Sequence, residues 1–278
     1  MLLLLSIAAV SLLAGVLACT VFAMSLWTAA LLAVGVFLGL ALLVFLFLLA
    51  VCKGIDQSVP QEKDSKFHRV LAGLVIGAAL PVLRIRIKTK GLEKMPKEGR
   101  FLLVCNHCND SDPIILLHVL RKFQLAFISK RENGSMFIVG KLMHKIMCQV
   151  LDRDNDRQAL KVIIRCIQLV RDEKMNLGVF PEGYCTTNGR LQHFRPGVFK
   201  IPLKTKVPIV VCTVNNTLQI FDNLPKLKPT DVDMHLVGVI QPEEYDGFST
   251  VQLADKVFQM MLQDLGPEYA PLEPKEEE

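Results

Sequence analysis

The first 52 residues contain no Lys, Arg, Asp, Glu or His, and all 59 acidic and basic residues lie from Lys53 onward. As one helix, this stretch would be about 78 Å long, against a hydrocarbon core of roughly 30 Å. We therefore predict two membrane-spanning helices, residues 2–24 and 27–52, that form a hairpin. A cleaved signal peptide, or a single span plus a processed segment, is the alternative. It fits less well because the start carries no positive charge.

The charges and cysteines after the hairpin predict on which side of the membrane the rest of the chain lies. Basic residues cluster just after the hairpin, which favours a cytoplasmic location for residues 53–278. The eight cysteines are scattered singly apart from Cys105 and Cys108, as expected for reduced thiols rather than a disulfide framework. We predict a multi-pass membrane protein with its globular part on the cytoplasmic face. The compact domain and short anchor favour a bacterial inner membrane.

Residues 53–100 are predicted to connect the anchor to the globular domain along the membrane surface. The apolar run 70–83 is too short to cross a bilayer and is interrupted by Pro81, so it should lie in the interface or pack under the domain. Seven basic and two acidic residues occur in 84–100. They suit an anionic lipid surface, although alternation of Ile85 and Ile87 with Arg84, Arg86 and Lys88 also predicts a strand with a solvated face.

Residues 101–266 show the alternating pattern of an α/β domain, and a polar tail, 267–278, comes after it. Apolar runs predict strands at 101–105, 125–129, 149–151, 177–180, 208–214 and 232–240, and helical patterns occur at 112–121, 136–147, 156–172 and 249–265. We predict a mixed sheet flanked by helices. This organisation excludes a disordered chain, a collagen-like repeat and a transporter embedded wholly in the membrane.

His107 and Asp112 lie where a buried strand stops and a helix begins, the edge at which α/β sheets bind ligands. Asp112 precedes Pro113, so it could simply cap the helix while His107 is a loop residue. Alternatively, His107 is a general base and Asp112 accepts the proton on its other ring nitrogen. The nearby Cys105-x-x-Cys108 has no second cysteine pair, so we predict no metal site.

A second polar cluster comes after the strand at 177–180. Phe180-Pro181-Glu182-Gly183 precedes three basic residues that could bind a phosphorylated, hydroxylated substrate, namely Arg190, Arg195 and Lys200. The plainer interpretation is a turn with a solvated acid and a charged helix start. Arg153 lies after the strand at 149–151, where it suits phosphate, although an ion pair with Asp152 or Asp154 explains it equally well.

Together these clusters resemble the glycerolipid acyltransferase family, which includes the lysophosphatidic acid acyltransferases. The resemblance covers about residues 66–265. Four blocks occur in the family's order: His107-x4-Asp112, Leu151-Asp152-Arg153, Phe180-Pro181-Glu182-Gly183 and Val207-Pro208-Ile209-Val210. One departure concerns Tyr184-Cys185-Thr186, which stands where members specific for lysophosphatidic acid often have Thr-Arg-Ser. Arg190 or Arg195 could replace the missing arginine.

The resemblance implies acyl transfer from a thioester to the sn-2 hydroxyl of 1-acylglycerol-3-phosphate, with His107 as base and no protein nucleophile. It implies that the glycerol and phosphate are held by Glu182 and Arg153, with Gly183, Arg190, Arg195, Lys200 and Lys130. The expected partners are membrane lipids, lysophosphatidic acid and acyl-CoA or acyl-acyl carrier protein as donor substrate, with no cofactor and no nucleic acid. The alternatives are another acceptor (lysophosphatidylcholine, lysophosphatidylethanolamine or glycerol-3-phosphate) or an inactive lipid-binding protein.

Overall fold

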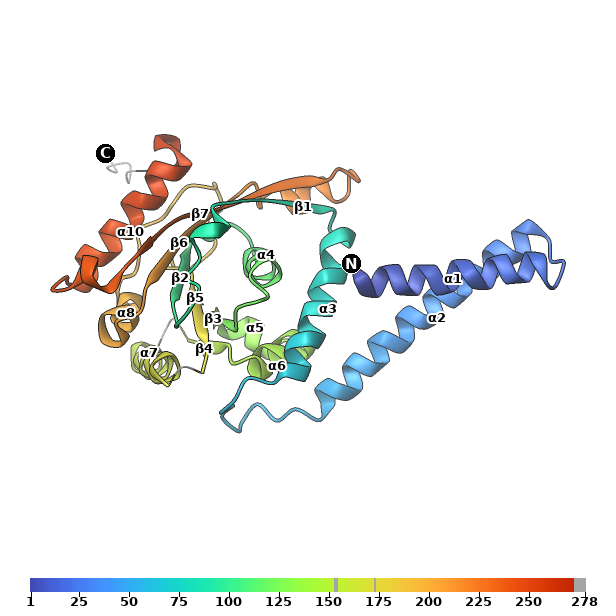
Figure 1. Ribbon diagram of the computed structural model, residues 1–278, viewed down its shortest axis with the longest axis horizontal. Helices are drawn as coiled ribbons and strands as arrows, with labels where there is room; N and C mark the ends of the chain where they lie inside the picture. The colour runs from blue at the N-terminus through green and yellow to red at the C-terminus, as the bar shows by residue number, and fades with distance from the viewer. Residues whose placement is uncertain (153–154, 173, 273–278) are drawn as a thin grey trace, which may run out of the picture.

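A seven-stranded mixed sheet forms the centre of the structure, a computed structural model that describes residues 1–152, 155–172 and 174–272 (Figure 1). The strand order is β1-β7-β6-β2-β5-β3-β4, and neighbouring strands are parallel except for β6 and β7. The mixed α/β fold predicted from the sequence is confirmed. The strands are β1 (Ile85–Lys90), β2 (Leu102–Cys105), β3 (Leu125–Lys130), β4 (Gln149–Leu151), β5 (Asn176–Val179), β6 (Ile209–Asn215) and β7 (Thr230–Ile240).

Helices cover both faces of the sheet. Figure 1 shows α7, α8 and α10 on one side and α3 and α4 on the other. The strands β2 and β5 are therefore buried along their whole length, as expected for central strands of a parallel sheet. The helices are α3 (Lys66–Val82), α4 (Asp112–Val119), α5 (Arg131–Ser135), α6 (Phe137–Lys145), α7 (Asp156–Arg171), α8 (Lys200–Thr205), α9 (Gln219–Asn223) and α10 (Thr250–Leu265).

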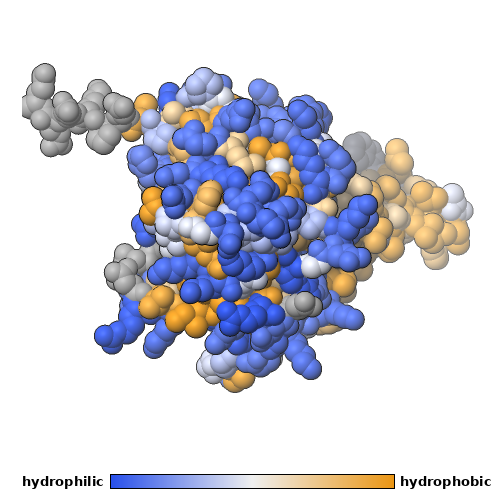
Figure 2. Space-filling view, turned by 60° about the vertical axis from the view of Figure 1, so that its left-hand side comes forward, coloured by the Kyte–Doolittle hydropathy of each residue, from blue (hydrophilic) through white to orange (hydrophobic). Residues whose placement is uncertain are grey.

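The N-terminal hairpin consists of α1 (Leu2–Thr20) and α2 (Leu26–Lys53). Both helices are long and apolar enough to cross a membrane. They pack closely: a Cβ added at Gly15 would lie 3.2 Å from the Ala33 Cβ. Large apolar side chains such as Leu12 and Leu31 are 67% and 72% exposed, and the hairpin projects as an apolar body from a largely hydrophilic domain surface (Figure 2). An apolar surface of this extent requires a lipid environment or a partner.

Helix α3 is the short apolar segment, and it packs against the domain. Leu71 and Leu80 are buried, whereas Phe67 is 56% exposed on the outer side. The Arg69 guanidinium pairs with Asp64 at 2.7 Å and donates to the Leu125 carbonyl at 2.8 Å, which ties α3 to the start of β3. The alternating basic run after α3 forms β1, as its periodicity predicts.

Candidate active site

The polar loops after β2 and β5 meet because these two strands are parallel neighbours. Asn106 fixes the first loop to β6: its Nδ2 donates to the Val214 carbonyl at 2.9 Å, and its Oδ1 accepts from the Val214 amide at 2.8 Å. The second loop is attached to the first by the Thr186 amide, which donates to the His107 carbonyl at 2.9 Å. The two motifs predicted from the sequence, 75 residues apart, thus form one site.

His107 and Asp112 form a buried pair. His107 Nδ1 lies 3.0 Å from Asp112 Oδ2. The same oxygen accepts the backbone amides of Cys108 and Asn109 at 2.7 and 2.8 Å, and Asp112 is fully buried. A carboxylate acceptor at Nδ1 assigns the ring proton to that nitrogen, so Nε2 carries the lone pair.

The alternative interpretation, in which Asp112 simply caps α4, is wrong. Ser111 occupies the cap position without a capping side-chain hydrogen bond, and Asp112 is the first helical residue. Its carboxylate turns back to the preceding loop, where two amides and the imidazole satisfy Oδ2. This geometry makes Asp112 an orienting partner of His107.

Aromatic stacking fixes the plane of the imidazole. The His107 ring lies 4.1 Å from the Phe180 ring at an interplanar angle of 20°, and Phe180 stacks in turn on Phe127 at 5.3 Å. His107 is only 9% exposed, and its free edge presents Nε2 to Cys185, whose Sγ lies 3.1 Å away.

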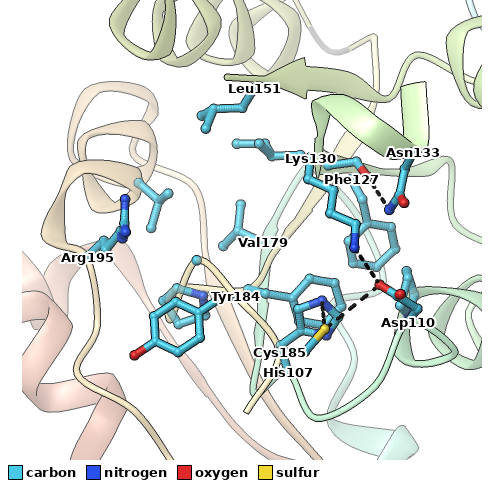
Figure 3. A pocket seen from close by; sticks show the side chains of 17 residues that line it. His107, Asp110, Phe127, Lys130, Asn133, Leu151, Val179, Tyr184, Cys185 and Arg195 are labelled. Atoms are coloured by element: carbon cyan, nitrogen blue, oxygen red, sulfur yellow. Dashed lines mark hydrogen bonds and ion pairs between the residues drawn. The ribbon is translucent and has the colours of Figure 1, made fainter. Parts of the chain in front are cut away.

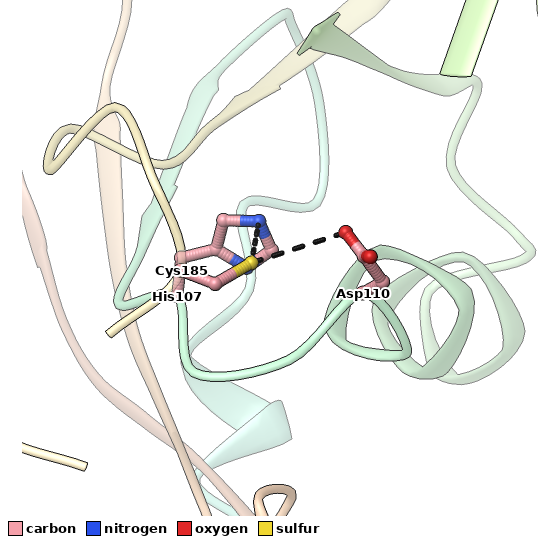
Figure 4. A group of neighbouring side chains, drawn as sticks. All are labelled: His107, Asp110 and Cys185. Carbon is pink, nitrogen blue, oxygen red and sulfur yellow. Dashed lines mark hydrogen bonds between the residues drawn. The ribbon is translucent and has the colours of Figure 1, made fainter. Parts of the chain in front are cut away.

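Asp110 completes a small group around this edge (Figure 4). Its Oδ1 is 3.9 Å from Cys185 Sγ, and one potential ligand atom each from His107, Asp110 and Cys185 lies within 4.8 Å of the others. Sulfur, nitrogen and oxygen donors at this spacing could hold a zinc ion. The sequence predicted no metal site, because Cys105-x-x-Cys108 has no second cysteine pair, and Cys185 lies 78 residues from His107 along the chain.

Glu182 lies behind the site rather than on its surface. It is 1% exposed, and its Oε2 accepts the His107 amide at 3.3 Å, while Oε1 has no hydrogen-bond partner among the described residues. Burial raises the pKa of this carboxyl to about 8, although the His107 and Gln192 amides act in the opposite direction. Glu182 therefore supports the loop carrying His107 and does not line the cavity.

A cavity of about 350 Å³ opens in front of the imidazole (Figure 3). Of the predicted substrate-binding residues, Gly183, Arg195 and Lys130 line it. The Lys130 ammonium lies 3.4 Å from Asp110 Oδ1, and the Arg195 amide donates to the Pro181 carbonyl at 2.8 Å. Basic side chains and apolar walls in one cavity suit a ligand with an anionic head and an apolar chain.

Two other predicted residues, Arg190 and Lys200, do not line this cavity. Arg190 donates to the Ala270 carbonyl at 3.1 Å and so holds the C-terminal segment. Lys200 is exposed at the start of α8 and does not line the cavity. Arg153 lies outside the described residues.

The fold and site define an α/β domain with a His–Asp pair at the carboxyl edge of its sheet, preceded by two candidate membrane-spanning helices. The family model described as Acyltransferase matches residues 86–215. The crystal structure of the 1-acyl-sn-glycerophosphate (LPA) acyltransferase PlsC from Thermotoga maritima is similar, with a TM-score of 0.61 and 20% identity, covering 74% of this chain and 81% of that one.

Curated relatives carry consistent names. The probable 1-acyl-sn-glycerol-3-phosphate acyltransferase of Mycoplasma pneumoniae is 26% identical, covering 64% of this chain and 67% of that protein. The mouse 1-acyl-sn-glycerol-3-phosphate acyltransferase alpha is 27% identical, covering 64% and 63%. A chloroplastic enzyme from Arabidopsis thaliana, LPAT1, is 31% identical, but only 42% of its length is covered. The chain is similar to the glycerolipid acyltransferases over most of its α/β domain.

Proposed function

We propose that this protein transfers a fatty acyl group from an acyl thioester to the free sn-2 hydroxyl of 1-acylglycerol-3-phosphate, giving phosphatidic acid. The observation that carries the proposal is the His107–Asp112 pair, 3.0 Å apart, with Nε2 at the edge of the cavity. The names of the relatives, 1-acyl-sn-glycerol-3-phosphate acyltransferases, support the choice of acceptor.

His107 acts as the general base in this reaction. Its Nε2 takes the proton of the acceptor hydroxyl as the oxygen attacks the thioester carbonyl, and Asp112 stabilises the resulting imidazolium. A base of this kind typically contributes about 10²–10⁴-fold to the rate. The released thiolate of the donor receives the proton when the tetrahedral intermediate breaks down.

Arg195 and Lys130 are the cavity residues suited to the acceptor phosphate. Both line the cavity that contains His107. A guanidinium can bind a phosphate through two parallel hydrogen bonds, whereas an ammonium acts as a compact charge.

The membrane anchor suits amphiphilic substrates, because acceptor and product both remain in the bilayer. We further propose that the catalytic domain faces the cytoplasm of a bacterial cell, at its inner membrane, where acyl-CoA or acyl-acyl carrier protein serves as donor. The basic segment before β2 supports this orientation. The test is protease accessibility of the domain in inverted and right-side-out vesicles.

A different acceptor is the second candidate. It is favoured by Tyr184-Cys185-Thr186 in the loop after Glu182, since this loop lines the cavity through Tyr184 and Cys185 and carries no arginine at those positions. The acceptor would then be lysophosphatidylcholine, lysophosphatidylethanolamine or glycerol-3-phosphate, with the same base.

An acceptor panel tests the proposal. Membranes containing the protein receive labelled acyl-CoA or acyl-acyl carrier protein with lysophosphatidic acid, lysophosphatidylcholine, lysophosphatidylethanolamine or glycerol-3-phosphate. His107→Ala is the inactive control, and His193→Ala, an exposed histidine that does not line the cavity, is the matched control. Phosphatidic acid formed by the wild type and His193→Ala but not by His107→Ala is expected. Transfer to no acceptor would instead favour an inactive lipid-binding protein.

A further inference from the structure

His107, Asp110 and Cys185 place three kinds of metal-binding atom at one edge of the imidazole. His107 Nε2 lies 3.1 Å from Cys185 Sγ, Asp110 Oδ1 lies 3.9 Å from the same sulfur, and one ligand atom of each residue lies within 4.8 Å of the others. Figure 4 shows the sulfur between the ring and the carboxylate. The ligand atoms of a tetrahedral zinc site are roughly 3.3–3.6 Å apart, so small side-chain rotations bring these three atoms onto one ion.

A buried carboxylate orients the imidazole for metal binding. His107 Nδ1 lies 3.0 Å from Asp112 Oδ2, so the ring proton is on Nδ1 and the lone pair is on Nε2, the atom that faces Cys185. Zinc-bound histidines usually have a carboxylate or carbonyl in this position, because it fixes the tautomer and raises the basicity of the ligand nitrogen. Stacking on Phe180 fixes the plane of the ring. The nitrogen ligand therefore needs no rearrangement to bind a metal.

The same group is accessible to an ion from solution. His107, Asp110 and Cys185 all line the cavity of about 350 Å³, which leaves a fourth position for water. The Asp110 side chain is 61% exposed, and its ion pair with Lys130 at 3.4 Å is of the exposed kind that contributes little and is readily exchanged. Three protein ligands and one open position are the ligand set of a zinc ion with an exchangeable site.

Cys185 is the described cysteine suited to this ion. Six of the other seven are buried, and the seventh, Cys19, lies in α1. None of these seven lines the cavity. A thiolate and an imidazole select zinc over magnesium and calcium, which prefer oxygen ligands.

We propose that His107 Nε2, Cys185 Sγ and Asp110 Oδ1 bind a zinc ion that reversibly inhibits the enzyme. On binding, the Cys185 thiol releases its proton to the solvent, and Zn²⁺ forms one bond each to thiolate, imidazole and carboxylate, with water as the fourth ligand. The two anionic ligands balance the charge of the ion. Zinc then occupies the lone pair that takes the proton of the acceptor hydroxyl. The inhibition rests on the proposed function of His107, whereas the metal site itself does not.

Metal binding is measured first, on the full-length protein in detergent micelles without acyl donor or acceptor. The protein is stripped with EDTA under a phosphine reductant, exchanged into metal-free buffer and titrated with Co²⁺, whose bond to a thiolate gives a charge-transfer absorption band. Zn²⁺ is then added, and loss of the band together with competition against a chromophoric chelator gives the zinc affinity. This readout needs no enzymatic activity.

The wild type is expected to show the thiolate band and to bind zinc at this site. Cys185→Ser should lose the band and bind zinc about 100-fold more weakly, and Asp110→Asn should keep the band but bind about 10-fold more weakly or worse. Asp112→Asn, which removes the carboxylate behind His107, should weaken binding by about 10–100-fold. Cys19→Ser is the matched control and should behave as the wild type, because Cys19 is the other described cysteine that is not buried.

Inhibition is measured next, as acyl transfer to lysophosphatidic acid at free zinc concentrations fixed by a chelator buffer. The buffer is needed because the thiol of released coenzyme A also binds zinc. Each variant is compared with its own zinc-free rate. The wild type and Cys19→Ser should be inhibited by zinc, restored by EDTA and unaffected by Mg²⁺ at the same concentration. Inhibition of Cys185→Ser should require about 100-fold more free zinc, in step with its affinity.

The outcomes separate this inference from the proposed function. No thiolate band in the wild type, or an unchanged band and zinc affinity in Cys185→Ser, overturns the metal site. Zinc bound through Cys185 with undiminished transfer overturns the inhibition. Inhibition of Cys185→Ser at the same free zinc as the wild type places the inhibitory ion elsewhere and overturns the assignment. Zinc bound through Cys185 in a protein that transfers to no acceptor supports the metal site and overturns the proposed function alone.

Discussion

Asp112 Oδ2 accepts three hydrogen bonds, from His107 Nδ1 at 3.0 Å and from the amides of Cys108 and Asn109 at 2.7 and 2.8 Å. Two of the donors are backbone groups of the loop that carries the histidine. The carboxylate therefore holds both the ring and its loop through one buried oxygen.

Replacing this carboxylate by an amide should disable the base without unfolding the domain. In Asp112→Asn, the side chain keeps its size but no longer stabilises an imidazolium, so kcat should fall by about 10²–10⁴-fold with a small change in KM. Steady-state kinetics and thermal unfolding check this. Asp222→Asn, an exposed acid on α9, is the control, and wild-type kcat in Asp112→Asn would contradict the assignment.

Glu182 should make the stability of the domain depend on pH. Burial raises its pKa to about 8 from the ordinary value of 4.5. Between these values the folded state binds a proton that the unfolded state has released, so the free energy of unfolding should fall as pH rises from about 4.5 to about 8. The full effect is on the order of 3–5 kcal/mol.

Glu182→Gln removes this titration, since an amide stays neutral throughout. Its unfolding free energy should therefore fall less than that of the wild type across the same pH range. Denaturant unfolding at several pH values between about 4.5 and 8.5 measures the difference. Identical pH profiles in the two proteins would show that the buried carboxyl is already ionised at low pH.

Gly183 should not tolerate a side chain. Its φ is +83°, and an added Cβ would lie 2.9 Å from Arg195 Nε. Gly183→Ala should destabilise the domain by about 1–3 kcal/mol and displace Arg195 from the cavity wall, raising KM for the acceptor. Gly99→Ala is the matched control, because Gly99 has a similar φ of +77° but no atom lies within 4 Å of the added Cβ. It should lower stability by about 1 kcal/mol and leave KM unchanged.

The sequence predicts that Arg195 and Lys200 both bind the substrate, but only Arg195 should contribute to the affinity for the acceptor. Arg195 lines the cavity, whereas Lys200 does not. Arg195→Ala should raise KM for a phosphate-bearing acceptor about 10–100-fold, the scale of a charge-assisted hydrogen bond, and Lys200→Ala should change it little. Acceptor titrations with both variants check this, and equal effects would place the phosphate nearer α8.

The sequence predicts individual elements well where burial is one-sided or complete. The strands β2 and β4 and helix α10 occur at the predicted positions within two residues, because a short apolar run or a capped amphipathic pattern defines each locally. The sequence could not reveal the antiparallel direction of β7, because an apolar strand has the same pattern in either direction.

The candidate site was only partly predictable, because a sequence pattern reveals residues that are close along the chain but not those that the fold brings together. His107 and Asp112 are five residues apart, and the pairing could be proposed from one motif. Cys185 reaches His107 across 78 residues, through the parallel pairing of β2 and β5. Its position in the loop after Glu182 was the available signal, but only the fold reveals which ring atom it contacts. Arg190 was predicted to bind substrate, but its guanidinium donates a hydrogen bond to the Ala270 carbonyl in the C-terminal segment.

The pairing of β1 with β7 has a consequence for synthesis on the ribosome. Ile85 pairs with Thr230, so the edge strand next to the anchor gains its neighbour only after nearly the whole domain has been translated. The apolar hairpin leaves the ribosome long before that point, while the basic strand β1 stays without its neighbour. Its basic side chains would disfavour pairing with a strand of another chain until β7 is made and the sheet closes.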